Sequence, residues 1–410
     1  MPADEGHDAH FRQGDGRPLC CGSFSSMGPL MLTLNGKALA WGGSAERTLW
    51  KLTSNPALPV VLREKMAFLQ RGNGPLPQGF GAYILPPEQQ GIPPCAHWLH
   101  LPPDFAYLAE GDIISVNAGR IRTLWRQNSP HNAVLLTERC DNNCVMCSQP
   151  PKNIEDHWLV AEAMDLVRMI PPSAPVLGFT GGEPALLGQR LIDLLALTRA
   201  RLPTTAVHLL SNGRGFADPA FSDAYAAIQH PDLMVGIPLY AADPAQHDYI
   251  VQARGAFDQT VRGILALKER GQRVEVRVVL HRQTIEGLPA LAQFIARNLQ
   301  FIDQVALMGL EVTGFARANL DQVWIDPADY RPTLENAVAL LRDYQVPVRI
   351  YNHPLCLLGE MAAQYSVKSI SDWKNEYVAE CAACTRRQDC GGFFSSGARY
   401  RYSPSLRPFL

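Results

Sequence analysis

Three cysteines near the middle of the chain are the residues whose types and spacing could support unusual chemistry. They are Cys140, Cys144 and Cys147, a C-x3-C-x2-C pattern that begins shortly after the apolar run at 133–136. Thiolates gathered this closely repel one another unless a metal neutralises their charge. Three ligands, rather than four, would leave one metal position open for a reacting molecule.

A second group of cysteines lies near the C-terminal end of the sequence. It consists of Cys356, Cys381, Cys384 and Cys390. Four thiolates complete a closed site. Zinc is the first interpretation of such a group in isolation, and an iron–sulfur cluster is the alternative.

A glycine pair and a carboxylate follow the apolar run at 176–179, as Gly181, Gly182 and Glu183. Glycines let backbone groups approach a ligand closely, and a neighbouring carboxylate can hold an ammonium group. The structural alternative is a plain turn into a helix, with Glu183 beside the positive N-terminal end. Both interpretations are open for this motif alone.

The elements that would position these residues begin at about residue 131, where strand-like apolar runs alternate with helical patterns. Strands are expected at 133–136, 176–179, 206–210, 233–239, 274–280, 304–309 and 346–351. Helices are expected at 159–169, 190–201, 219–228, 257–269, 288–299 and 329–344. This alternation indicates parallel βαβ units. It predicts an α/β fold with a partial (β/α)6 TIM-type barrel, in which the C-terminal strand ends carry the active site.

The sequence divides into four predicted segments around this barrel. Residues 1–26 are expected to be a flexible tail, and 27–130 a β-rich domain, because short apolar runs there are broken by Gly and Pro. The partial barrel is expected at 131–350, and a small cysteine-rich extension at 351–410. No motif in the β-rich domain indicates a chemical function. This domain could hold a partner or a peptide, or only cover the barrel.

Composition limits the class of protein. Of the 410 residues, 47% are hydrophobic and 19% are charged, which is typical of a soluble globular chain. The formal net charge of -2 gives no reason to expect a nucleic-acid or membrane partner. The polar start has no apolar signal segment, and no apolar run reaches the roughly 18 residues of a spanning helix. A reducing, cytoplasmic setting is expected, where clustered cysteines bind metal rather than each other.

The cysteine triplet after the first barrel strand, followed by the glycine pair after the second, resembles the radical S-adenosylmethionine (SAM) superfamily. This resemblance implies a [4Fe–4S] cluster with one open iron, held by the triplet, and SAM as cosubstrate. It implies that Gly181, Gly182 and Glu183 contact the amino group of SAM. Met146 takes the place where many members have an aromatic residue beside the adenine, and Ser211 begins a Ser-Asn-Gly turn often found after the third strand.

Two later segments bear on the same resemblance. After the fourth strand, where the family often places a polar residue against the ribose, this chain has Pro238-Leu239-Tyr240, so that contact does not carry over simply. The pair His247-Asp248 resembles a common family segment and is expected to act as a structural hydrogen bond or cap rather than as an acid–base pair.

In this company the C-terminal cysteines resemble the auxiliary-cluster domains, of SPASM or shorter twitch type, attached to many peptide-modifying radical SAM enzymes. The resemblance implies a second, auxiliary [4Fe–4S] cluster held by Cys356, Cys381, Cys384 and Cys390. A fully ligated cluster of this kind carries electrons or acts structurally.

The narrowest resemblance is to the HxsC maturases of the His-Xaa-Ser peptide system. It rests on residues 135–140 and on the Ser-Gln-Pro-Pro-Lys tail at 148–152. It implies reductive cleavage of SAM to a 5′-deoxyadenosyl radical, which abstracts hydrogen from a ribosomally made precursor peptide with His-Xaa-Ser repeats. A paired second radical SAM maturase and a reducing donor such as a flavodoxin or ferredoxin are implied partners. A radical SAM enzyme of small molecules and a non-catalytic zinc-binding module are the alternatives.

Overall fold

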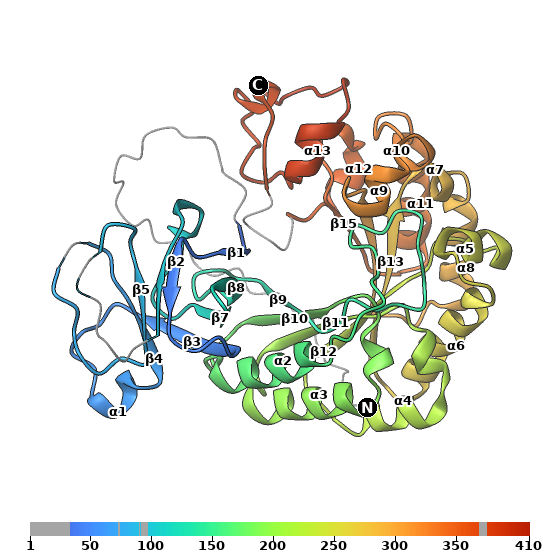
Figure 1. The fold of residues 1–410 in the computed structure, drawn as a ribbon. Helices are drawn as coiled ribbons and strands as arrows, with labels where there is room; N and C mark the ends of the chain where they lie inside the picture. The colour runs from blue at the N-terminus through green and yellow to red at the C-terminus, as the bar shows by residue number, and fades with distance from the viewer. Residues whose placement is uncertain (1–32, 73, 90, 92–96, 369–374) are drawn as a thin grey trace, which may run out of the picture. The chain divides into compact units, whose positions relative to one another are not determined.

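The fold contains two β-sheets, one on each side of residue 130 in the sequence (Figure 1). The computed structural model describes residues 33–72, 74–89, 91, 97–368 and 375–410. These residues belong to one compact unit, Met31–Leu410. The tail predicted at 1–26 lies outside the described residues.

The first sheet has eight strands and closes on itself. The strands are β1 (Asn35–Lys37), β2 (Ala40–Gly42), β3 (Thr48–Thr53), β4 (Met66–Leu69), β5 (Ala82–Leu85), β6 (His97–His100), β7 (Ile113–Asn117) and β8 (Arg120–Trp125). Their order is β1-β8-β7-β3-β4-β5-β6-β2. Only Ala38 and Leu39 separate β1 from β2, and their amide groups donate to Gly119 and His100 at opposite ends of the sheet. The segment 35–42 therefore bridges the two ends and covers both edges.

The first sheet agrees with the β-rich region expected from the sequence. The apolar run that begins at Pro59 forms the short helix α1 (Val60–Arg63), whose Val60 and Val61 are exposed. Proline fixes its φ near the helical value, which suits the residue before a helix. A short 3-10 helix, η1 (Pro103–Phe105), precedes β7.

The second sheet consists of seven parallel strands in sequence order, from β9 at one edge to β15 at the other. The strands are β9 (Asn132–Leu135), β10 (Val176–Thr180), β11 (Ala206–Leu210), β12 (Leu233–Pro238), β13 (Arg273–Leu280), β14 (Gln304–Gly309) and β15 (Val348–Tyr351). The edge strands do not pair with each other, so the barrel is partial. This confirms the predicted fold class, and each predicted strand boundary lies within two residues of the observed one.

Helices follow the strands of this sheet and cover its outer face (Figure 1). They are α2 (Trp158–Met169), α3 (Gln189–Arg201), α4 (Pro219–Ala226), α5 (Pro244–Val251), α6 (Ala256–Glu269), α7 (Arg282–Ile285), α8 (Leu288–Asn298), α9 (Gly314–Ala318), α10 (Leu320–Val323) and α11 (Arg331–Asp343), with the 3-10 helices η2 (Pro184–Leu187) and η3 (Arg214–Ala217). Outer-face residues such as Val276, Val278 and Val305 are completely buried, and each stabilises the fold by roughly 1.5–3 kcal/mol.

The helix α5 was not predicted from the sequence. It has eight residues and weak amphipathic character, so periodicity does not reveal it. Its start is set locally: the Asp243 side chain accepts a hydrogen bond from the Gln246 amide at 2.8 Å, and Pro244 occupies the first turn.

Residues beyond β15 are mostly irregular. They contain η4 (Leu355–Leu357), α12 (Glu360–Ala363), η6 (Ala379–Cys381) and α13 (Ser395–Tyr400), with isolated bridges from Ile350 to Ser366 and from Glu376 to Phe393. In the described ranges, every helix is too short or too polar to cross a membrane. The boundaries proposed from the sequence, at 27–130, 131–350 and 351–410, stay a prediction.

Candidate functional site

The cysteine triplet lies on the loop between β9 and α2, at the carboxyl end of the first barrel strand. Cys140, Cys144 and Cys147 are free thiols, and all three residues are partly buried. This is the position expected from the sequence, because the carboxyl ends of the strands form the functional face of such barrels.

The two ends of this loop are tied together at its base. Asp156 is fully buried, and its carboxylate accepts from the Thr137 hydroxyl at 2.8 Å and from the Glu138 amide at 2.6 Å. The Lys152 amide donates to the Glu138 carbonyl at 2.8 Å, and the two side chains form an ion pair. The Ser-Gln-Pro-Pro-Lys tail therefore ends on the strand side of the loop.

Polar residues after β11 hold the segment between the first two cysteines. Asn212 donates through Nδ2 to Asp141 Oδ1 at 2.6 Å. Arg214 donates to the Asp141 carbonyl at 2.8 Å and to Asn142 Oδ1 at 2.7 Å, and it forms an ion pair with the Asp141 carboxylate at 3.0 Å. Sequence reasoning missed this role of Asn212 and Arg214, because their partners lie about 70 residues away.

Backbone contacts fix the rest of the loop. The Val145 amide donates to the Ile250 carbonyl at the end of α5, at 3.0 Å. The Phe315 amide, in α9, donates to the Cys147 carbonyl at 2.8 Å. Gly314 has a φ of +52°, and a Cβ there would lie 2.6 Å from that same carbonyl oxygen. The three thiols thus sit on a loop held from four directions.

The three thiols on this loop are the kind of donor set that holds iron–sulfur clusters. Burial raises the pKa of Cys140 to about 12, and the nearby carboxylates of Glu183 and Asp141 act in the same direction. Burial and the other two thiols also raise the pKa of Cys144. Without a cation these thiols stay protonated, and an iron group would bind them by displacing the protons. The Asn142 amide, 3.4 Å from Cys140 Sγ, is placed to donate to such a thiolate.

Across the described ranges, no three His, Cys, Asp or Glu side chains surround a single point that would hold one metal ion. In a [4Fe–4S] cluster each iron takes its own thiolate, so the ligands of a cluster lie further apart than those of a single ion.

The glycine pair lies directly against the cysteine loop. The Gly182 amide donates to the Thr137 carbonyl at 2.8 Å, and the Glu183 amide donates to the Arg139 carbonyl at 2.7 Å. A Cβ on Gly182 would lie 2.1 Å from Arg139 O and 3.1 Å from Cys140 Cβ. The glycine is therefore required by the close approach of two backbones, which brings the two sequence motifs together.

Glu183 is buried and joins the ends of β10 and β11. Its carboxylate accepts from the Ser211 hydroxyl at 2.7 Å, from the Asn212 amide at 2.5 Å and from the Ala185 amide at 2.8 Å. Burial raises its pKa to about 7, against the lowering effect of these hydrogen bonds. The side chain caps η2, which is the structural alternative considered from the sequence.

Met146 packs in a small apolar cluster between the triplet loop and α5. The cluster contains Tyr240, Ile250 and Val251, and Cys144 packs against it. Tyr240 stacks on His247 with ring centroids 5.9 Å apart, and the His247 ring accepts from the Tyr240 amide at 3.2 Å.

Asp248 accepts hydrogen bonds from the amides of Gly255 and Phe257, the latter at 2.9 Å. It therefore caps the start of α6. This agrees with the prediction that His247-Asp248 acts as a structural hydrogen bond or cap.

A polar network on the inner face of the barrel was not found from the sequence. Glu275 is 4% exposed; its carboxylate accepts from Arg277 at 2.8 Å and from Gln304 Nε2 at 2.5 Å. Arg277 also donates to Met308 Sδ at 3.0 Å, and Gln304 lies 3.4 Å from the Tyr351 hydroxyl. The signal was present as charges at every second position of a Val-rich strand, 273–277, which place them on one face.

His281 follows β13, directly before α7, and is completely buried. Neither of its ring nitrogens has a hydrogen-bond partner among the described residues. Burial lowers its pKa to about 3, so the ring is neutral at physiological pH. Its ring centroid is 6.4 Å from that of Tyr240.

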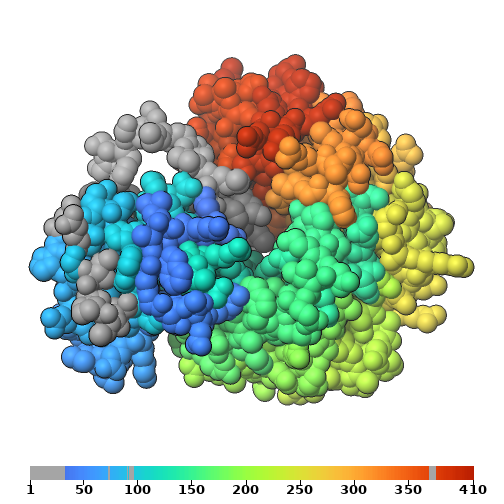
Figure 2. Space-filling model, in the orientation of Figure 1, coloured from blue at the N-terminus to red at the C-terminus, as the bar shows by residue number. Residues whose placement is uncertain are grey.

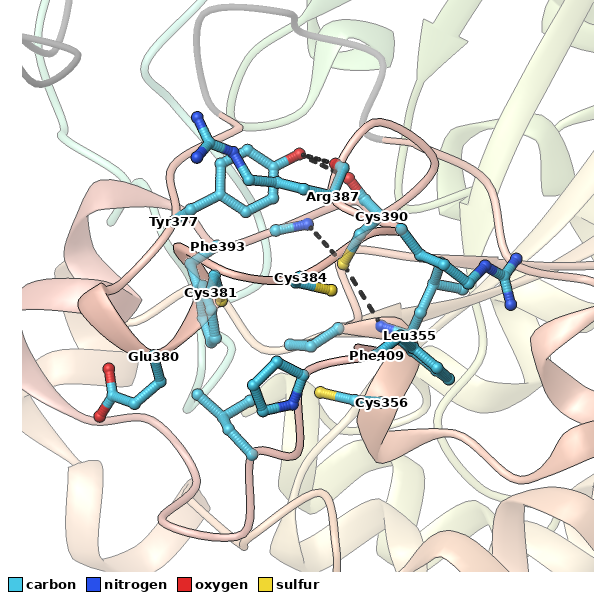
Figure 3. A pocket seen from close by; sticks show the side chains of 15 residues that line it. Leu355, Cys356, Tyr377, Glu380, Cys381, Cys384, Arg387, Cys390, Phe393 and Phe409 are labelled. Carbon is cyan, nitrogen blue, oxygen red and sulfur yellow. Dashed lines mark hydrogen bonds between the residues drawn. The ribbon is translucent and has the colours of Figure 1, made fainter. Parts of the chain in front are cut away.

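The structure gathers the four C-terminal cysteines around one pocket (Figure 3). Cys356 comes from η4, Cys381 ends η6, and Cys384 and Cys390 follow on the next loop. The pocket has an empty volume of about 410 Å³, part of it open to solvent. The amides of Leu355 and Gly392 each lie 3.4 Å from Cys390 Sγ.

Burial acts on the thiols of this pocket as well. Burial raises the pKa of Cys356, and the Cys390 and Cys384 thiols act in the same direction. Burial also raises the pKa of Cys381, where the other three thiols add to the effect. All four thiols are free, so the donor set fits a group with four thiolate ligands.

The fold is a partial parallel barrel with a cysteine triplet at the carboxyl end of its first strand. Residues 134–295 match the family described as the Radical SAM superfamily. Within residues 134–295 the chain is therefore similar to radical SAM domains.

Several solved structures are similar to this chain. One is Streptococcus suis SuiB bound to S-adenosylmethionine, with 16% identity, 56% of this chain and 51% of that chain covered, and a TM-score of 0.44. Another is native anSMEcpe with bound AdoMet and Kp18Cys peptide, with 14% identity, 68% and 91% covered, and a TM-score of 0.46. A third is methylornithine synthase (PylB), with 14% identity, 57% and 67% covered, and a TM-score of 0.40. The chain spans about half the length of SuiB.

Proposed function

We propose that this chain is a radical SAM maturase in which Cys140, Cys144 and Cys147 hold a [4Fe–4S] cluster with an open iron. Gly181, Gly182 and Glu183 would hold SAM beside it, with Met146 and Ser211 in supporting contact. The observation that carries the proposal is the direct packing of the glycine pair on the triplet loop, where the Glu183 amide donates to the Arg139 carbonyl at 2.7 Å.

When bound and reduced, this group supplies the electron that splits the SAM sulfonium into methionine and a 5′-deoxyadenosyl radical, which takes a hydrogen atom from the substrate. The protein's own residues position the reactants and exclude water. Asn212 and Arg214 hold the loop between the first two cysteines. Met146 and Tyr240 close the apolar side of the loop, where both side chains are almost fully buried.

Cys356, Cys381, Cys384 and Cys390 would hold a second, auxiliary [4Fe–4S] cluster. Support comes from their convergence on one pocket. Zinc is the competing occupant, because four thiolates also suit that metal.

Iron, sulfide and zinc analysis after anaerobic reconstitution tests both assignments. Wild-type protein should hold about eight irons, and Cys144→Ser and Cys384→Ser should each lose about four. SAM cleavage should vanish only when the triplet is changed, if the auxiliary cluster is structural. Zinc without sulfide in the wild type would refute the cluster assignments.

The proposed substrate is a ribosomally made precursor peptide with His-Xaa-Ser repeats, processed with a paired second radical SAM maturase. Support comes from the sequence resemblance at 135–140 and 148–152. Radical chemistry on a small molecule is the alternative function.

Incubation of the reconstituted enzyme with SAM and a peptide from a neighbouring reading frame, followed by mass spectrometry, separates these two functions. A peptide mass change that requires Cys144 supports the maturase. Turnover of a small molecule, with no peptide bound or modified, refutes it.

A further inference from the structure

The helices α9 and α10 lie between the two cysteine groups of the chain. They follow the carboxyl end of β14; one side of them contacts the triplet loop, and the other side contacts α13 in the C-terminal segment (Figure 1). In Figure 2 their orange surface adjoins the red surface of that segment. We call residues 313–324 the bridge.

The bridge binds the main chain on both sides of the third cysteine. The Asn319 side chain donates through Nδ2 to the Val145 carbonyl at 2.8 Å, and the Thr313 hydroxyl donates to the Ser148 carbonyl at 3.2 Å. A backbone amide of α9 donates to the Cys147 carbonyl between them at 2.8 Å. Three carbonyl groups of the triplet loop therefore accept hydrogen bonds from one segment, which lies 165 to 174 residues further along the chain.

Apolar contacts hold the same two surfaces together. Ala316 and Val323 of the bridge are completely buried, and they belong to the apolar cluster that contains Met146 and Tyr240. Cys144 packs against this cluster. Because packed interiors transmit strain, a displacement of the bridge would change the packing around the second cysteine as well as the hydrogen bonds around the third.

The opposite side of the bridge is held by the C-terminal segment. Arg317 of the bridge lies over the Tyr400 ring at 4.1 Å, and Arg401 lies over the Trp324 ring of the bridge at 4.3 Å. Arg401 also lies 3.9 Å from Asp321, whose side chain is exposed. Contacts of this kind are individually weak at an exposed site. Their loss should therefore loosen the bridge without unfolding the protein.

The residues next to these contacts lead to the four-cysteine pocket. Tyr402 and Phe393 form an edge-to-face pair with ring centroids 5.7 Å apart. Phe393 lines the pocket together with Cys390 (Figure 3). A connected series of contacts thus leads from the pocket through α13 and the bridge to the triplet loop. Coupling between two sites can be carried by such a series of packed side chains.

We propose that the bridge is a positioning element through which the C-terminal segment sets the geometry of the cysteine triplet, with Asn319 as its main positioning residue. The inference rests on the proposed function, because it concerns the rate of SAM cleavage at the triplet. It applies whether the four C-terminal cysteines hold a cluster or zinc, since the contacts are made by α13 and not by the thiols. Only the placement of the triplet loop changes, and no bond is made or broken by the bridge itself.

Variants of the full-length, reconstituted protein separate the two sides of the bridge. N319L removes the donor to the triplet loop at nearly constant side-chain volume, and R317Q/R401Q removes both stacked cations. The control R190Q/R297Q removes two exposed charges from α3 and α8. A displacement of about 1 Å at a reacting group lowers a rate roughly 100-fold, and a loosened loop is displaced by less. With SAM and dithionite, we expect 5′-deoxyadenosine formation per bound cluster to fall about tenfold in N319L, about threefold in R317Q/R401Q and less than about 1.5-fold in the control.

The triple variant N319L/R317Q/R401Q measures whether the two sides are coupled. If the arginines act through Asn319, the triple variant should lose about tenfold, as N319L does alone, because the effects of coupled residues do not add. Independent effects would multiply to about thirtyfold and would overturn the proposal. In R317Q/R401Q the SAM-dependent change in the electron paramagnetic resonance spectrum of the reduced protein should differ from that of the wild type, which a purely stabilising contact would leave unchanged.

Three other outcomes would refute the coupling: a wild-type rate in R317Q/R401Q, an equal loss in the control, or lower thermal stability and iron content with an unchanged rate per bound cluster. The last would make the stacked arginines stabilising contacts only. Failure of the proposed function has a different signature, because the wild-type protein would then contain no iron and sulfide or form no 5′-deoxyadenosine.

Discussion

The substitution Gly182→Ala probes the contact between the glycine pair and the cysteine loop. The added Cβ would lie 2.1 Å from Arg139 O, whereas a carbon and an oxygen in contact stay about 3.3 Å apart. The backbones must therefore separate by about 1 Å. Neither side can yield freely, because the Glu183 amide donates to the same oxygen at 2.7 Å. A displacement of about 1 Å at a reacting group lowers the rate roughly 100-fold, and we expect that loss in SAM cleavage.

The matched control is Gly178→Ala in the same strand, β10. Its Cβ would meet nothing closer than Ala133 Cβ at 3.4 Å, an ordinary contact. Both variants are reconstituted anaerobically and compared by iron content, SAM affinity, the electron paramagnetic resonance spectrum of the reduced cluster and 5′-deoxyadenosine formation. Wild-type rates and spectra in Gly182→Ala, or equal losses in Gly178→Ala, would refute the steric argument.

Three further changes test the network around the site. Arg277→Met leaves the nearly buried Glu275 carboxylate without its cation and should destabilise the fold by roughly 2–3 kcal/mol in urea unfolding, since the arginine is one-fifth exposed; adding Glu275→Gln should recover most of this loss. His281→Phe removes two unpaired ring nitrogens and should leave stability at pH 7 equal or higher. Arg214→Ala releases Asn142 and should lower iron retention after gel filtration about tenfold.

The pH dependence of His281 has a definite sign. Its folded-state pKa is lowered to about 3 from the model-compound value of 6.5, so the neutral ring stabilises the fold above pH 6.5 and the contribution decreases as pH falls. Between pH 7 and pH 5 the wild type should lose about 2 kcal/mol that His281→Phe does not lose. Parallel urea titrations at the two pH values measure this difference, and identical slopes for both proteins would show that the ring is accessible to protons.

The barrel could be predicted from sequence because each of its strands is an apolar run with helical periodicity on either side. All outer-face residues must be buried under the helices, so the pattern is repeated seven times along the chain. The helix α5 was not predicted, because a helix of eight residues with weak amphipathic character gives no clear periodic pattern. The closure of the first sheet by residues 35–42 was also hidden, since the partners of β1 and β2 lie about 60 to 85 residues away.

The site could be predicted only where its residues form short sequence motifs. The spacing of the cysteines and of the glycine pair identified them, but no local spacing identified the residues that hydrogen-bond to them. Arg214 donates a hydrogen bond to Asn142, which lies 72 residues away in the sequence, and Gln304 donates one to Glu275, which lies 29 residues away. Such pairs depend on which strand ends are neighbours, a property of the sheet order and not of any local run of residues.

The residues of the Gly-Gly-Glu motif can be required by the fold as well as by a ligand. Gly182 must lack a side chain because the Arg139 carbonyl lies where its Cβ would be. Glu183 must be buried because its carboxylate joins Ser211 and Asn212 on the neighbouring strand end. Either reason would preserve the residues in a protein that bound no cosubstrate. The two roles are separable by experiment, because Glu183→Gln keeps the shape and the Ser211 and Ala185 hydrogen bonds, removes the negative charge and gives up only the hydrogen bond from the Asn212 amide. If SAM affinity falls while thermal stability and iron content hold, the charge serves the ligand; if stability falls and affinity per folded molecule is unchanged, the carboxylate serves the fold.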